Sequence, residues 1–113
     1  MGGIWTTSIT NNTGGSGTIT AYRSGNVVSI SLKGVFNSLK TTSTTVGTVP
    51  QGFKPIDACY SEGALFTDTP KYRIGVASST GDIVVLIRNL DNTNITTAQN
   101  VTIYTSISYM TND

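Results

Sequence analysis

The sequence of 113 residues has no histidine, a single cysteine and few charged side chains, which make up 12% of the chain. Histidine is the usual general base and the commonest metal ligand near neutral pH, so its absence removes the simplest catalytic and metal-binding arrangements. Cys59 cannot form a disulfide within the chain, so stability must come from packing or from association with other chains. We expect Cys59 to be a small, buried and unreactive thiol.

Net charge and long apolar runs are also scarce. Seven lysines and arginines oppose six aspartates and glutamates, which gives a net charge of +1. The chain has no basic patch of the kind that binds nucleic acid, and no apolar run approaches the length that spans a membrane. We therefore expect neither a nucleic-acid partner nor membrane insertion. We expect one domain over residues 1–113. Residues 1–3 do not resemble a signal peptide, and we expect them to be a short cloning remnant at the start of the domain.

The carboxylates do not suggest an active site or a metal site. A pair of carboxylates can cleave a glycoside, but no spacing selects a pair among Asp57, Glu62, Asp68, Asp82, Asp91 and Asp113. Residues 91–94 offer oxygen ligands in a loop, but they lack the glycine and the bidentate glutamate of a calcium loop. We expect no enzyme activity, no bound metal and no cofactor.

What the sequence does contain is a series of short alternating patterns. Residues 18–23 and 27–32 flank a Ser-Gly-Asn turn and predict a β-hairpin. In the second strand, Val28, Ile30 and Leu32 alternate with serines, which predicts one core face and one polar face. No segment has the 3.6-residue period and the caps of a helix. We expect an all-β fold, a small antiparallel β-barrel or sandwich of about six to eight short strands.

Further strands are predicted over residues 72–76, 83–87 and 101–109, the last with alternate apolar residues on one face. The strand over residues 83–87 is apolar on both faces. One face can fill the core, and the other needs a cover from elsewhere in the chain or from a second copy. The sequence leaves two explanations for the second apolar face: it lies in a subunit interface, or the strand is an ordinary central strand covered on both sides. The polar stretch over residues 89–100 is long for a loop in a compact domain, and such loops are often functional.

A rigid corner is predicted between the two halves, at residues 45–55. Pro50 removes a ladder donor and fixes φ, so strand pairing should stop there. Gly52 can supply the positive φ of a turn, and Phe53 is the one bulky apolar side chain in the turn that could plug a core. We expect this corner to carry the chain from one sheet to another.

Two arginines are candidates for a binding site. Arg73 alternates against Tyr72 and Ile74, so it points away from the core face, and Arg88 has the parity of Leu86 in the neighbouring strand. If the two strands form a hairpin, both arginines lie on the same face. Aromatic rings and planar hydrogen-bonding side chains recognise sugars, which makes this face a candidate saccharide site. An equally supported alternative to a binding site is that Arg73 and Arg88 are simply two solvated cations at strand ends.

The corner also carries a resemblance. The segment Val49-Pro50-Gln51-Gly52-Phe53-Lys54-Pro55, preceded by Gly47-Thr48, is similar to one common in receptor-binding proteins and tail fibres of phages that infect Gram-positive bacteria. The hairpin Tyr22-Arg23-Ser24-Gly25-Asn26-Val27-Val28-Ser29-Ile30 and the order of strands from Tyr72 to Tyr109 also resemble theirs, so the likeness covers most of residues 18–110. Within that group, the chain resembles the C-terminal head domains of lactococcal phage baseplate receptor-binding proteins.

The resemblance implies a fold, an assembly and a site. Heads of that family are small antiparallel β-barrels that form homotrimers and bind host cell-wall saccharides, often near the protomer interface. Their sugar-contacting strand has the pattern aromatic-His-apolar-Asp, where this chain has Tyr72-Arg73-Ile74-Gly75, and Tyr109 matches a C-terminal tyrosine. By this carry-over, we expect Arg73 and Arg88 to donate hydrogen bonds to a saccharide and Tyr109 to stack on it.

The predicted function is non-covalent attachment. We expect a head domain at the distal tail, baseplate or fibre tip of a virion, in contact with other tail proteins, that binds host cell-wall saccharide during adsorption. The alternative is a structural or interaction module of the tail or fibre that binds no sugar. A cell-wall-degrading enzyme is the third hypothesis, and the missing histidine argues against it.

Overall fold

The computed structural model of the chain describes residues 2–9, 15–65 and 70–112, and in these residues it contains eight β-strands and no helix. The predicted all-β class is confirmed. The strands are β1 (Gly2–Ser8), β2 (Ser16–Ser24), β3 (Val27–Leu39), β4 (Thr44–Thr48), β5 (Cys59–Ala64), β6 (Pro70–Val76), β7 (Asp82–Asn89) and β8 (Gln99–Met110). Asp68 and Asp113, two of the six carboxylates, lie outside the described residues.

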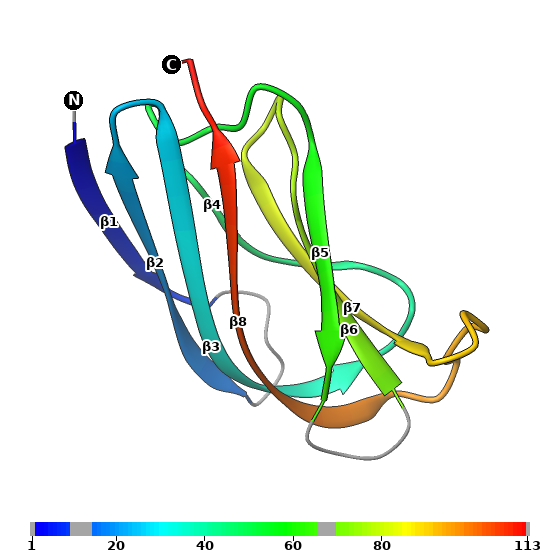
Figure 1. Cartoon of the computed structure of the whole chain (residues 1–113). Helices are drawn as coiled ribbons and strands as arrows, with labels where there is room; N and C mark the ends of the chain where they lie inside the picture. The colour runs from blue at the N-terminus through cyan, green and yellow to red at the C-terminus, as the bar shows by residue number, and fades with distance from the viewer. Residues whose placement is uncertain (1, 10–14, 66–69, 113) are drawn as a thin grey trace.

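The strands form two antiparallel sheets that face each other (Figure 1). Sheet A has the order β1-β2-β3-β8, and sheet B has the order β4-β7-β6-β5. β5 and β8 approach each other along one side, but no strand pairing joins the two sheets in the described part of the chain. The structure is therefore a sandwich of two open sheets, and the expected homotrimer stays a prediction.

The core lies between the sheets and follows the alternation in the sequence. Val28, Ile30 and Leu32 of β3 are fully buried, and the serines between them face outward. On sheet B, Ile83 and Ile87 of β7 are fully buried against them. The predicted hairpin and both predicted core faces are confirmed, because burial of alternate residues is what the period of two requires.

β1 includes two of the three residues that we expected to lie outside the fold. Gly2 pairs with Ser24 and Gly3 with Arg23 in the ladder between β1 and β2. A Cβ atom at Gly3 would lie 3.6 Å from the ring of Phe53. Residues 2 and 3, which we expected to be a remnant, are therefore paired into sheet A.

The corner at residues 45–55 has the predicted local shape but not the predicted destination. The N–H of Phe53 donates to the carbonyl of Pro50 at 3.1 Å, and Gly52 has a φ of 94°, as a turn with glycine at its third position requires. Phe53 packs against the core, as expected of a plug. However, β4 and β5 on either side of the corner are the two edges of sheet B. The prediction that the corner changes sheets is wrong, because the chain changes sheets between β3 and β4 and between β7 and β8.

A close packing contact positions β5 against β6. Gly63 of β5 lies opposite Tyr72 of β6, and the phenol of Tyr72 occupies the space that a Cβ atom at Gly63 would need. The Tyr72 hydroxyl donates to Thr105 Oγ1 of β8 at 2.7 Å, which links sheet B to sheet A. The absence of a side chain at Gly63 thus lets Tyr72 turn inward, while the neighbouring residues of β5 and β6 face outward.

Candidate functional site

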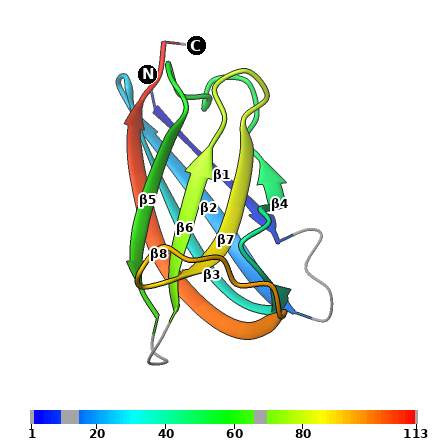
Figure 2. The same cartoon turned by 90° about the vertical axis from the view of Figure 1, so that its right-hand side faces the viewer.

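The strand register of sheet B gathers charged side chains on its outer face. Glu62 of β5 lies opposite Arg73 of β6, and Lys71 of β6 lies opposite Arg88 of β7. Tyr60 precedes Glu62 by two residues and shares its face. We call these five residues the β5–β6–β7 patch, after the three strands that run side by side in Figure 2.

Arg73 is held in place from two directions. Its Nε atom donates to Glu62 Oε2 at 3.1 Å, and its Nη2 atom lies 3.0 Å from the same oxygen. The guanidinium carbon lies 4.5 Å from the centre of the Tyr60 ring, which is the geometry of a cation–π contact. Tyr60 is still 65% exposed. A rigid guanidinium therefore sits beside an aromatic ring that solvent can reach.

The β5–β6–β7 patch is positively charged. Its three cations and one carboxylate give a net charge of 3 − 1 = +2. Lys71 Nζ lies 3.3 Å from Glu62 Oε1, so one carboxylate bridges Lys71 and Arg73. No carboxylate of the described residues forms an ion pair with Arg88, and the buried Arg88 Nε atom has no hydrogen-bond partner among them. The positive charge of the patch, with the Arg73 N–H groups that Glu62 does not use, suits an anionic or hydroxyl-bearing ligand.

Glu62 is kept ionised by its neighbours. Desolvation acts to raise the pKa of its carboxyl, but the hydrogen bonds and positive charges of Lys71 and Arg73 together outweigh it. The net effect holds the pKa below the ordinary value. At neutral pH Glu62 is therefore an acceptor that orients the two cations, and it has no proton to donate.

The structure brings together two of the three predicted site residues. Arg73 and Arg88 lie on the same face of adjacent strands, two residue positions apart along the ladder, as the hairpin argument predicted. Tyr109 instead points into the core from sheet A, is 7% exposed and donates its hydroxyl proton to the carbonyl of Phe53. The expectation that Tyr109 stacks on a saccharide is therefore corrected: its ring faces are covered, and its hydroxyl anchors the corner.

Sequence reasoning missed Tyr60, Glu62 and Lys71 as members of the patch. Tyr60 and Glu62 are two residues apart, which is a signal that they share a face of a strand. Their proximity to Arg73 depends on the register between β5 and β6. No pattern in the sequence specified that register.

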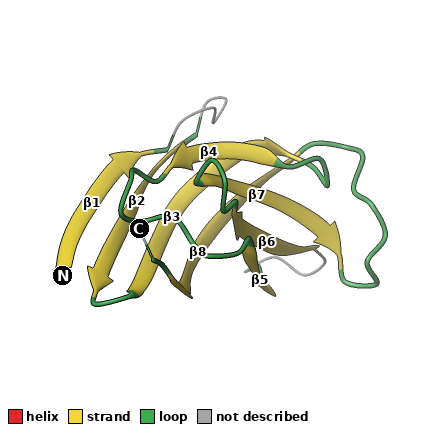
Figure 3. Cartoon of the chain, turned by 90° about the horizontal axis from the view of Figure 1, so that it is seen from above, coloured by secondary structure: helices red, strands yellow, loops and turns green. Residues whose placement is uncertain are grey.

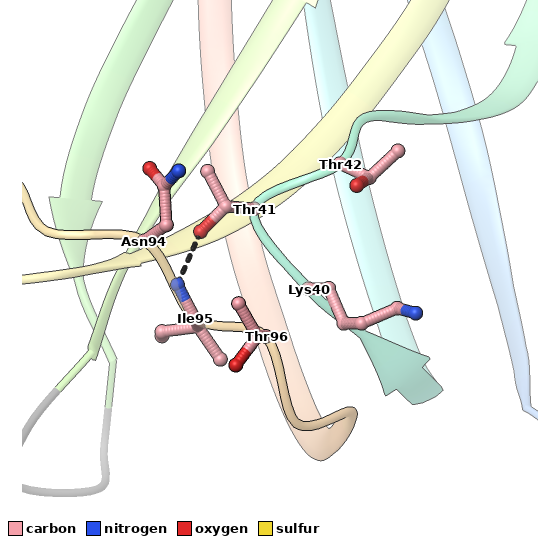
Figure 4. A pocket seen from close by; sticks show the side chains of 6 residues that line it. All are labelled: Lys40, Thr41, Thr42, Asn94, Ile95 and Thr96. Carbon is pink, nitrogen blue, oxygen red and sulfur yellow. Dashed lines mark hydrogen bonds between the residues drawn. The ribbon is translucent and has the colours of Figure 1, made fainter.

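A second candidate is a pocket beside the long polar connection between β7 and β8. It has a volume of about 390 Å³ and is lined by Lys40, Thr41, Thr42, Asn94, Ile95 and Thr96. Figure 4 shows Thr41 pointing toward the backbone of Ile95. The Thr41 hydroxyl accepts from the Ile95 N–H at 2.6 Å and donates to the Ile87 carbonyl at 3.0 Å. The Thr41 hydroxyl thus holds the connection against β7, which gives this side of the pocket a structural role.

Neither a metal site nor a reactive thiol is evident in the described residues. The Asp91 carboxylate accepts from the backbone N–H and the hydroxyl of Thr93, and these hydrogen bonds hold its pKa below the ordinary value. In the part of the chain that the structure describes, no three metal-ligating side chains cluster. Burial raises the pKa of Cys59, although a hydrogen bond from Val76 opposes the shift, so its thiol stays protonated near neutral pH.

No protein-family model matches the chain, and a search of curated proteins finds no match. In the described ranges, none of the structure forms a helix that is long and apolar enough to cross a membrane. The geometry of the β5–β6–β7 patch is therefore the main structural pointer to function.

Proposed function

We propose that this chain is a receptor-binding head domain of a phage that infects Gram-positive bacteria. On this proposal it acts on the virion surface and attaches non-covalently to a host cell-wall saccharide through the β5–β6–β7 patch. The support in the sequence is the resemblance at residues 47–55 and in the order of the strands. The support in the structure is a fixed guanidinium beside an exposed aromatic ring on an open sheet face.

The observation that carries the proposal is the fixed position of Arg73. A guanidinium has five N–H donors, and the contacts with Glu62 use those on Nε and Nη2. The remaining donors can bind sugar hydroxyls or an acidic group. Because the Tyr60 ring and Glu62 already hold the side chain, binding a ligand would cost little further conformational entropy.

The charge of the patch favours a saccharide that carries acidic groups. A net charge of +2 on one sheet face attracts anions at low ionic strength. The exposed ring of Tyr60 offers an apolar surface for the C–H face of a sugar. Each site would bind weakly, and several copies on one virion would strengthen the attachment.

Titration with purified cell-wall polysaccharide fragments from Gram-positive hosts tests the proposal. We expect the wild-type chain to bind at least one fragment and Arg73→Ala to bind it about tenfold more weakly, a loss of about 1.4 kcal/mol. Lys33→Ala is the matched control, because Lys33 is an exposed cation on the outer face of sheet A. Equal binding by wild type and Arg73→Ala would place any saccharide site elsewhere. Failure of every fragment to bind would favour a structural module of the tail.

The structural alternative also has an observation in its favour. β1 forms an edge of sheet A that makes no backbone hydrogen bonds on its outer side with other described residues. A module that joins other copies or other tail proteins would use such an edge. This surface is on the opposite sheet from the β5–β6–β7 patch, so attachment and assembly are compatible in one chain.

A further inference from the structure

We propose that the free edge of β1 binds a second copy of this chain, with the two β1 strands paired antiparallel around a twofold axis near Trp5. β1 pairs with β2 on one side only, and its other side has no backbone hydrogen bond to a described residue. Figure 3 shows β1 at the outer end of sheet A. An unpaired strand edge presents N–H and C=O groups that are ready to pair with another strand.

β1 lacks the features that normally keep strand edges apart, which are charges, prolines and bulges. It pairs seven consecutive residues with β2 without a register shift, and it contains no charged residue and no proline. Among the other edges of the described sheets, β4 has five residues and a register shift, and β5 carries Glu62. β8 runs beside β5, and its Met110 carbonyl accepts a hydrogen bond from Ile56. The long, regular and uncovered edge is therefore that of β1.

Exposed apolar side chains lie on the outer face of sheet A, one of them on β1 itself and the others on β2, β3 and β8. Ile4 is 72% exposed and lies opposite Tyr22, which is also exposed. Val27 and Met110 are exposed and lie opposite each other at the end of β3 and β8. The two rows of residues that contain these side chains carry serine and glycine but no charged side chain on this face. An exposed apolar surface depleted of charge is typical of a protein contact.

Any strand that pairs with this edge must have an unpaired, uncharged edge of its own. β1 of a second copy meets both conditions. Antiparallel pairing of β1 with β1 places like side chains near each other, which would repel if they were charged. β1 has none, so the pairing meets no charge repulsion, and twofold dimers are the commonest closed assemblies. One strand and a few side chains make a small interface, so we expect a dissociation constant of roughly micromolar or weaker.

The mass of the chain in solution, measured by sedimentation over a dilution series, tests the pairing. We expect the mass to rise from 11.9 kDa toward twice that value with concentration. Ile4→Lys would place two like charges close to the twofold axis and weaken the dimer by about tenfold or more. Because Ile4 is largely exposed, the substitution should not disturb the fold. Leu90→Lys is the matched control, since Leu90 is 62% exposed in the connection after β7, and it should leave the dimer unchanged.

Hydrogen exchange gives a readout that needs no substitution. The outward-facing amides of residues 2–8 should exchange more slowly at high protein concentration than at low concentration, while exchange in β5 should not change. A mass that stays at 11.9 kDa at every concentration would overturn the proposal. A trimer whose β1 amides show no added protection would also overturn it, and would favour the assembly that the phage-head resemblance implies. Neither result would depend on whether the β5–β6–β7 patch binds a saccharide.

Discussion

Lys71 and Arg88 lie directly opposite each other on β6 and β7, so two positive charges share one residue pair of sheet B. Like charges at directly opposite positions destabilise an antiparallel sheet. Glu62 contacts Lys71 and Arg73 but not Arg88, so it offsets only part of the repulsion. An anion bound next to Arg88 would remove the rest. The repulsion within this pair therefore lowers the stability of the fold, and a bound negatively charged ligand would reduce the repulsion.

Replacement of Arg88 by glutamine tests this cost. We expect Arg88→Gln to raise the free energy of unfolding by about 0.2–1 kcal/mol at low salt, because the repulsion with Lys71 is lost. The gain should shrink at high salt, where the charges of the wild-type pair are screened. Denaturant titration at the two salt concentrations measures both effects. Arg88→Lys keeps the charge and should show no gain, and an equal gain in both variants would show that packing, not charge, is responsible.

The alternation of apolar residues made much of the fold predictable. In β3 and β7, the residues at every second position fill the core, because a strand exposes alternate side chains to opposite sides. The same parity was available for Tyr109, which alternates in step with Val101 and Ile103. Its burial follows from that parity, and the family resemblance was the weaker guide at this position.

Pairing between distant strands was not predictable in the same way. The sequence places Arg73 and Arg88 on one face only if their strands are neighbours, and that condition is met because a short connection joins β6 to β7. The positions of Glu62 and Tyr60 beside Arg73 depend on the register of β5, which contains small residues with little apolar alternation. A strand with such a weak pattern does not specify its own register. Because strand pairing was not specified by the sequence, the prediction that the corner at residues 45–55 changes sheets was also wrong.

Glu62 should make stability depend on pH in the acidic range. Its pKa in the folded chain is below the ordinary value of 4.5, so its contribution to stability is present above that value and is lost as the pH falls through the folded pKa. We expect wild type to lose more stability than Glu62→Gln between about pH 6 and about pH 3. Denaturant titration of both chains at the two pH values measures the difference. Parallel losses in the two chains would show that Glu62 is not stabilised by Lys71 and Arg73.

Tyr109 and Arg73 should show opposite behaviour when they are substituted. Tyr109→Phe removes the hydroxyl that donates to the Phe53 carbonyl, and we expect it to lower the free energy of unfolding by about 1–2 kcal/mol. It should leave saccharide binding unchanged, because the ring lies between the sheets. Arg73→Ala should weaken binding and change stability by less than about 1 kcal/mol, since its ion pair is at the surface. Thermal unfolding and fragment titration of both variants separate the two roles.

Thr41 should contribute more to stability than its position in a surface pocket suggests. Its hydroxyl joins the segment after β3 to β7 and to the connection before β8, through Ile87 and Ile95. Thr41→Val keeps the shape of the side chain but loses both hydrogen bonds, and we expect a cost of about 1–3 kcal/mol. The Ile95 amide should also exchange faster with solvent, because it loses its acceptor.

Thr42→Val is the control for Thr41→Val. Thr42 is exposed, lines the same pocket and is the neighbouring residue, so the substitution repeats the chemistry without touching Ile87 or Ile95. We expect it to change the free energy of unfolding by less than about 0.5 kcal/mol. If Thr41→Val and Thr42→Val were equally mild and the Ile95 amide kept its protection, the two hydrogen bonds would not hold the connection. In that case the pocket at residues 40–42 and 94–96 would be free to open, and its polar lining would become a candidate for ligand binding.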